Sequence, residues 1–166
     1  MEHTCPPGEE RGLTAAEIAL ARRVFGDAIA YTPVRIRRRR WFPWQPLRTV
    51  MAPCGHIHFH PRAQFYCDDF AASGMDLQGL FIHEMTHVWQ AQRKGWHFLP
   101  THRHPWCRYE YTLEPGKPFE RYGLEQQAEI VRHAFMLLSG VSVEGLAPLS
   151  VYLELLPFTP QLRSAT

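Results

Sequence analysis

Two histidines and a glutamate in the stretch His83-Glu84-Met85-Thr86-His87 could hold and use a zinc ion. On an α-helix, residues four apart lie on one face, so both imidazoles would point at a common position. Glu84 would lie about 100° further round the helix, where its carboxylate reaches a water molecule beside the metal rather than the metal itself. Two zinc ligands with a general base between them are typical of a peptidase site.

The motif lies in a stretch of sequence that favours a helix. From Asp76 to Lys94 there is no proline, apolar residues recur at spacings of three and four, and Gly95 follows as a stop. Apolar neighbours would bury His83 and His87, and a buried imidazole pair is satisfied when it binds a metal. The alternative is a helix with two ordinary histidines packed against aromatic residues.

A zinc site of this kind needs a third protein ligand. The extended pattern H-E-x-x-H-x-x-G-x-x-H is excluded, because Gln90 and Arg93 occupy the two additional positions. Glu125 and Glu129 lie one turn apart in a second helical pattern, over residues 123–139. One carboxylate could bind the metal while the other accepts the N–H of a ligating histidine. The alternative for such a pair is a solvated helix face.

Together, the two motifs resemble the gluzincin pattern, in which H-E-x-x-H is followed by E-x-x-x-D/E, here E-Q-Q-A-E. One helix, then strands over 34–37, 50–53 and 57–60, then the motif helix is an order similar to that of compact bacterial zincin domains found beside toxin and secretion-system proteins. The chain also resembles sequences known as Vgr-related proteins, a name that points to type VI secretion. The resemblance implies an α+β minimal zincin fold, with a small mixed sheet packed against the motif helix and flanking helices.

The same resemblance implies a role for each motif residue. His83, His87 and Glu125 would be zinc ligands, Glu84 the general base, and Glu129 the partner of a ligating histidine. Because the family more often has aspartate at position 129, the sequence leaves open whether Glu125 or Glu129 touches the metal.

Cleavage of a peptide bond also requires a donor for the developing oxyanion. Tyr109, Tyr111, Tyr122 and His133 are candidate residues on flanking segments, and His133 lies one turn beyond Glu129 on the same helical face. For each of them alone, a role in the core or on the surface is the alternative. We therefore expect a zinc-dependent peptidase, with Zn²⁺ as cofactor and a peptide or protein as substrate.

Two other functions remain open. In the first, the protein is a non-catalytic, zinc-containing binding or adaptor domain linked to a secretion system, although such a structural site would not need Glu84. In the second, His102 or His104 is the third ligand, and the arginines at positions 35 and 37–40 contact DNA, as in DNA-associated zinc proteases. The lack of a C-x-x-C pair argues against the second function.

Length and composition predict one domain. The 166 residues can bury a core without disulfides, and the four cysteines are scattered. We expect a flexible N-terminus over residues 1–12 and a zincin-like domain over 13–166. A net charge of +2 does not indicate nucleic-acid binding. Without a signal peptide or a membrane-spanning segment, the protein is expected to be cytoplasmic, or delivered by a secretion system that needs no signal peptide.

Sequence patterns also predict the elements that must position these residues. Thr14 and Glu17 form a capping box for a helix over residues 15–25. Polar and apolar residues alternate over 34–37 and 57–60, as in half-buried strands. We expect 57–60 to form the sheet edge over the zinc, with its histidines facing water. Further strands are expected over 65–67 and 109–113, and a last short helix over 148–156.

Overall fold

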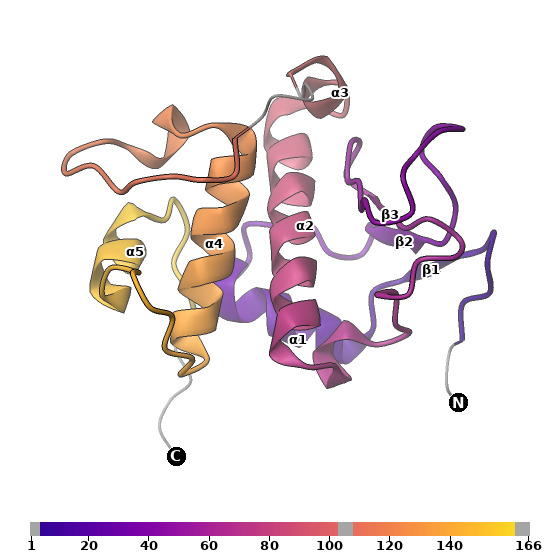
Figure 1. The fold of residues 1–166 in the computed structure, drawn as a ribbon, viewed down its shortest axis with the longest axis horizontal. Coiled ribbons are helices and arrows are strands. Elements are labelled where there is room, and N and C mark those ends of the chain that lie inside the picture. Colours follow the sequence, from indigo (N-terminus) through magenta and orange to yellow (C-terminus); the bar gives the residue numbers. More distant parts are fainter. Residues whose placement is uncertain (1–3, 103–107, 162–166) are drawn as a thin grey trace.

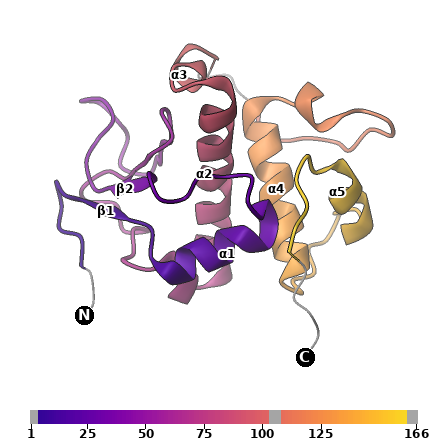
Figure 2. The ribbon, with the colours of Figure 1, turned by 180° about the vertical axis from the view of Figure 1, so that it is seen from behind.

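The computed structural model describes residues 4–102 and 108–161. Helices α2 and α4 stand side by side at its centre, with the small sheet beside α2 and helix α5 on the outer side of α4 (Figure 1). Helix α1 runs across the back of this pair (Figure 2). The arrangement is mixed α+β, which confirms the predicted class. The elements in chain order are β1 (Glu10–Gly12), α1 (Ala15–Phe25), β2 (Arg35–Arg37), β3 (Ile57–His58), the 3₁₀ helix η1 (Phe70–Ala72), α2 (Met75–Lys94), α3 (Phe98–His102), the 3₁₀ helix η2 (Phe119–Arg121), α4 (Leu124–Leu138) and α5 (Leu149–Leu155).

The two central helices form where the periodicity predicts them. Helix α2 ends at Gly95, whose positive φ of 99° suits a residue without Cβ. From Phe81 to Ala91 every side chain of α2 is buried, so the helix forms the interior of the domain rather than one of its faces. The two motif histidines therefore lie inside the protein. Among the described helices, none combines the length and the apolar character that crossing a bilayer requires.

A buried carboxylate fixes the start of α1. Thr14 and Glu17 form the predicted capping box, with reciprocal hydrogen bonds between side chain and backbone. The side chain of Glu17 is fully buried, and it accepts two hydrogen bonds of 2.8 Å from the Arg11 guanidinium and one of 3.0 Å from the Phe70 N–H. This one carboxylate therefore joins β1, α1 and η1.

The sheet has three short strands, and its outer edge differs from the prediction. Strand β2 pairs antiparallel with β1 and parallel with β3. The segment 57–60 forms a strand at only two residues, and its far side is already paired. The Met51 N–H donates to the His58 carbonyl at 3.1 Å, and the His58 N–H donates to the Met51 carbonyl at 2.7 Å. Strand β3 is therefore the outer strand of the sheet, as predicted, but its edge is not open at His58, because the chain around Met51 pairs with it there.

The alternation predicted that the histidines of this segment face water, and this was wrong. His58 and His60 are only 3% and 4% exposed. The Trp41 ring packs edge-on against His58 at 5.4 Å between centroids, and the Arg39 carbonyl lies 3.3 Å from its Nδ1. Burial, followed by the charge of Arg37, lowers the pKa of His58 to about 4. A neutral imidazole can therefore occupy this position in the core.

Two expected strands are absent from the described residues. The segments 65–67 and 109–113 have no ladder partner. Side chains hold the second segment instead, since the Gln126 side-chain amide donates to the Glu110 carbonyl at 2.7 Å. The predicted last helix is present as α5, and its buried side chain is that of Tyr152.

The N-terminal segment contrasts with the flexible tail expected over residues 1–12. Cys5 is buried, its N–H donates to Asp68 at 2.8 Å, and its carbonyl accepts from Arg38 at 2.9 Å. Arg37 and Arg39 both pair with Glu10, at 2.8 Å and 3.1 Å. Three arginines of the basic run thus hold the N-terminal segment to the sheet.

Replacing Arg11 with methionine should destabilise the fold strongly, because it leaves the Glu17 carboxylate buried without its guanidinium. We expect the free energy of unfolding to fall by about 3–5 kcal/mol. Denaturant unfolding measures this. The matched control is Arg22→Met, which removes an exposed ion pair of 3.6 Å with Asp27 and should cost less than about 1 kcal/mol. Equal losses in the two variants would contradict the anchoring role of Glu17.

Candidate metal centre

Helices α2 and α4 run antiparallel, and their register brings the two sequence motifs together. His83 meets Glu129, while His87 meets Glu125. A step of four residues forward along α2 thus corresponds to a step of four residues backward along α4. Because this spacing is one turn on each helix, both contacts lie on one seam between the helices.

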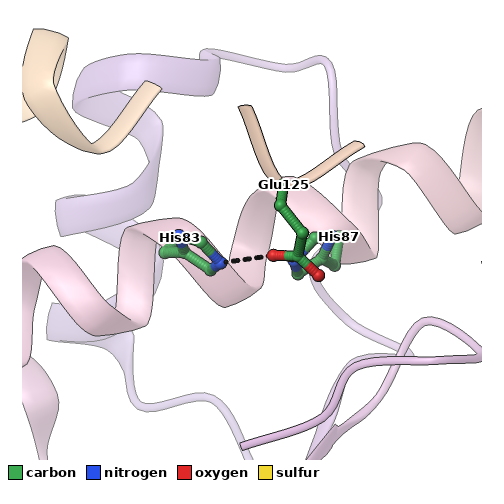
Figure 3. A group of neighbouring side chains, drawn as sticks. All are labelled: His83, His87 and Glu125. Atoms are coloured by element: carbon green, nitrogen blue, oxygen red, sulfur yellow. Dashed lines mark hydrogen bonds and ion pairs between the residues drawn. The ribbon is translucent and has the colours of Figure 1, made fainter. Parts of the chain in front are cut away.

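Three side chains converge at the middle of this seam, with the glutamate between the two imidazoles (Figure 3). Glu125 Oε2 lies 3.1 Å from Nε2 of His83 and 3.1 Å from Nε2 of His87. One ligand atom from each residue lies within 4.8 Å of the others. The three residues are 6%, 2% and 1% exposed for His83, His87 and Glu125. The structure therefore places Glu125, rather than Glu129, with the two histidines.

The outer nitrogen of His87 has a partner of its own. Its Nδ1 lies 2.8 Å from Oε1 of Gln90. The Gln90 amide nitrogen donates to the Leu124 carbonyl at 3.1 Å and to Oε1 of Gln127 at 2.9 Å, so the orientation of the amide is fixed by its network. Since Gln90 can only accept from the imidazole, Nδ1 of His87 carries the proton and Nε2 presents a lone pair.

Glu129 is the hydrogen-bond acceptor for the outer nitrogen of His83. Its Oε1 lies 2.7 Å from Nδ1 of His83, on the side of the ring away from Glu125. Burial raises the pKa of the Glu129 carboxyl, but the hydrogen bond and charge of His83 and the charge of Arg132 together lower it below its usual range. The carboxylate is therefore ionised and accepts the Nδ1 proton.

The converging atoms fit a zinc ion. Two imidazole lone pairs and a carboxylate oxygen that face one another repel unless a proton or a cation lies between them. Two histidines and one glutamate form the ligand set of catalytic zinc sites that keep a fourth position open. Burial lowers the pKa of His83, but hydrogen bonds to Glu125 and Glu129 outweigh it and raise the pKa to about 9. The site thus favours a positive charge.

Glu84 and Tyr109 lie beside this group. With His83 they line a cavity of about 360 Å³. Glu84 is buried, and among the residues that the structure describes its Oε2 has no hydrogen-bond partner. The Tyr109 ring stacks on His83, with centroids 6.2 Å apart and planes 22° apart.

The other candidates are more distant from the three converging side chains. Nε2 of His133 lies 3.8 Å from Oε2 of Glu129, in an adjoining cavity of about 670 Å³ that Tyr109 also lines. The Tyr111 hydroxyl contacts Nδ1 of His133 at 2.5 Å. Tyr122 lines neither cavity.

The hydroxyl of Tyr122 accepts a hydrogen bond from the Glu114 N–H at 3.0 Å.

The alternative third ligands were His102 and His104. His104 and the side chain of His102 lie outside the described part of the chain.

Gln90 and Gln127 were missed as site residues by sequence reasoning, which used Gln90 only to exclude a longer motif. A local signal existed, since Gln90 lies three residues after His87 and hence on the same helical face. Gln127 Nε2 donates to the Tyr122 carbonyl at 2.8 Å, so the chain of amides links His87 to the segment before α4.

Comparison with known proteins gives one related protein and its solved domain. No protein-family model matches the chain. The type VI secretion system spike protein VgrG2b of Pseudomonas aeruginosa is 44% identical over an alignment of 133 residues, and the match covers 76% of this chain but 13% of that protein. The effector domain of Pseudomonas aeruginosa VgrG2b has a solved structure that matches with a TM-score of 0.66 and 39% identity. That match covers 84% of this chain and 78% of that domain. The similarity therefore spans most of one domain and a small part of the spike protein.

Replacing Gln90 with leucine should weaken zinc binding by about 10- to 100-fold, because His87 loses the acceptor that fixes its tautomer. Titration against a chelator of known affinity measures the change. Gln92→Leu is the control, since that amide binds the backbone of Ala30 at 2.9 Å on an exposed part of the same helix. If both variants bind zinc equally well, Gln90 does not support the metal.

The metal-free protein should lose stability as the pH rises. The raised pKa of His83 means that its proton stabilises the fold fully below pH 6.5 and no longer does so above about pH 9. A zinc ion bound at this site would replace this proton, so the rise in melting temperature on adding zinc should grow between these two values. Thermal unfolding with and without zinc across this pH range tests it. A zinc effect that is constant or shrinks as pH rises would contradict the assignment.

Proposed function

This chain belongs to the family of the VgrG2b effector domain, and we propose that it is a zinc-dependent peptidase. The observation that carries the proposal is the position of Glu84. Its carboxylate is buried beside His83, lines the same cavity, and has an oxygen without a hydrogen bond to any described residue. A zinc site with a purely structural role is closed by its ligands and has no use for such a group.

Each residue of the centre has a task in this proposal. His83, His87 and Glu125 would hold Zn²⁺, while Glu129 and Gln90 keep the two imidazoles in the ligating orientation. Zinc bound there supplies Lewis acidity, which polarises a peptide carbonyl and lowers the pKa of a water molecule. Glu84 removes the proton from the attacking water and delivers it to the leaving amine.

Tyr109 is the best placed of the candidate donors to the oxyanion. It lies over His83 and lines both adjoining cavities, whereas His133 lies 3.8 Å from the outer carboxylate Glu129 and in contact with Tyr111. Space on either side of Tyr109 lets a peptide extend in both directions from the centre. This favours cleavage inside a chain, as in an endopeptidase.

The comparisons support a link to type VI secretion more directly than they support any chemistry. We therefore propose that the domain serves as an effector of such a system, since the matched domain is called an effector domain and the matched protein a spike protein. A non-catalytic zinc-containing adaptor in the same secretion assembly is the second candidate function. It would have the same zinc ligands but would not depend on Glu84.

Glu84→Gln separates these two functions. The variant should retain zinc at natural stoichiometry but lose cleavage by about 10²- to 10⁴-fold, because Glu84 acts on water and not on the metal. Cleavage sites in a cell lysate, mapped by mass spectrometry, provide the readout without a known substrate. His83→Ala should lose both zinc and cleavage. If the natural protein contains zinc but produces no more cleavage than Glu84→Gln, the adaptor function is favoured.

A further inference from the structure

The cavity beside His83 and Glu84 has two arginines in its wall, and we propose that they bind a carboxylate of the substrate. Arg48 and Arg132 line this cavity from different parts of the chain, one from the segment before Val50 and the other from α4. The inference rests on the proposed peptidase function and adds a substrate class to it. The enzyme would prefer peptides that carry a carboxylate close to the cleaved bond.

Arg132 occupies a position that α2 leaves open for it. A Cβ built on Gly79 would lie 3.1 Å from Nε of Arg132, which is tighter than ordinary contact. Gly79 is buried within α2, where glycine is less favourable than alanine. The missing side chain at this position therefore lets the guanidinium lie close to the helix, beside the cavity.

The guanidinium of Arg132 has donors to spare. Its Nη1 lies 3.5 Å from Oε1 of Glu129, and its buried Nε has no hydrogen-bond partner among the described residues. Glu129 Oε1 is at the same time 2.7 Å from Nδ1 of His83. A guanidinium carries five N–H donors, and a carboxylate shared with His83 uses few of them. Nε lies buried against Gly79, so the donors available to a second carboxylate are the N–H groups of Nη1 and Nη2 that Glu129 does not use.

Arg48 adds a second positive charge to this wall. It is exposed, and within the described ranges it forms no hydrogen bond or ion pair. Val50, Phe65 and Leu80 supply apolar surface in the same cavity. A short side chain with an apolar stem and an anionic end would contact both kinds of surface.

Two carboxylates of the protein, Glu84 and Glu129, also line this cavity, and neither removes its preference for an anion. Glu129 is bound by His83 and Arg132. Glu84 lies next to the candidate metal position, where a zinc ion adds two positive charges. Two arginines and zinc carry four positive charges against the three negative charges of Glu84, Glu129 and the ligand Glu125, so the cavity keeps a net positive charge and attracts an anion when the metal is bound.

Two groups of a peptide have this chemistry, namely the side chain of Asp or Glu and the α-carboxylate of the C-terminus. Peptides with both ends blocked, in pairs that differ only by Glu or Gln next to the cleaved bond, test the side chain. Pairs with a free or an amidated C-terminus test the α-carboxylate. We expect the natural protein to cleave the carboxylate member of one pair with a kcat/KM at least about tenfold higher, as charge-assisted hydrogen bonds imply.

Three variants test the arginines through this ratio. Arg132→Met and Arg48→Gln should each lower the preference several-fold, and Gly79→Ala should also lower it, because the new methyl group displaces Arg132 without changing the charge. Since both peptides of a pair are measured on one variant, a general loss of activity cancels. Arg93→Gln, an exposed arginine at the far end of α2, should keep the natural ratio.

A binding measurement separates this inference from the proposed function. Zinc-loaded Glu84→Gln should bind the carboxylate peptide more tightly than its amide counterpart in calorimetry, and Arg132→Met in that background should remove the difference. If peptides are cleaved but each pair equally well, the carboxylate site is overturned and the peptidase stands. If the natural protein cleaves no peptide, the peptidase proposal fails, and equal binding of the paired peptides would overturn the carboxylate site as well.

Discussion

The Glu125 carboxylate lies in the protein interior between two imidazoles, and the packing around it depends on how its negative charge is compensated. A buried carboxylate costs much free energy unless opposite charge and hydrogen bonds surround it. Here its Oε2 has Nε2 of His83 and of His87 at 3.1 Å each. When both imidazoles are neutral, the hydrogen bonds on the far sides of the rings turn the Nε2 lone pairs towards it, so a proton or a metal ion must lie between them. Two histidines and one glutamate are a ligand set of zinc, which is why we propose zinc as the cation between them.

That requirement explains why the seam between α2 and α4 carries polar side chains inside an otherwise apolar core. Gln90 and Gln127 continue the network from His87 to the backbone before α4. Tyr122, a candidate donor to the oxyanion in the sequence, lies at the end of this network, and its carbonyl and hydroxyl both hold backbone and amide groups in place. The candidate metal centre and the start of α4 are therefore positioned by one set of hydrogen bonds.

The sequence predicted the parts of this centre that depend on local spacing. Glycines and periodicity placed α2 and α4, and the motif spacing placed the imidazoles on one face. The choice between Glu125 and Glu129 needed the rotation of α4 against α2, which no local pattern contains. The exposure of His58 was mispredicted for a similar reason, because the chain around Trp41 covers a strand face that the alternation predicts to be exposed to solvent. Arg132 was not recognised because its position depends on Gly79, a residue of another helix.

X-ray absorption at the zinc edge tests most directly whether this buried carboxylate and its two imidazoles form a zinc centre. The natural protein, purified with stoichiometric zinc, should show only nitrogen and oxygen donors at about 2.0–2.2 Å, with the multiple-scattering signature of two imidazoles. Glu125→Ala should lose one oxygen donor or the metal itself. Sulfur at about 2.3 Å, or a spectrum that Glu125→Ala leaves unchanged in a protein that still binds zinc, would contradict the account.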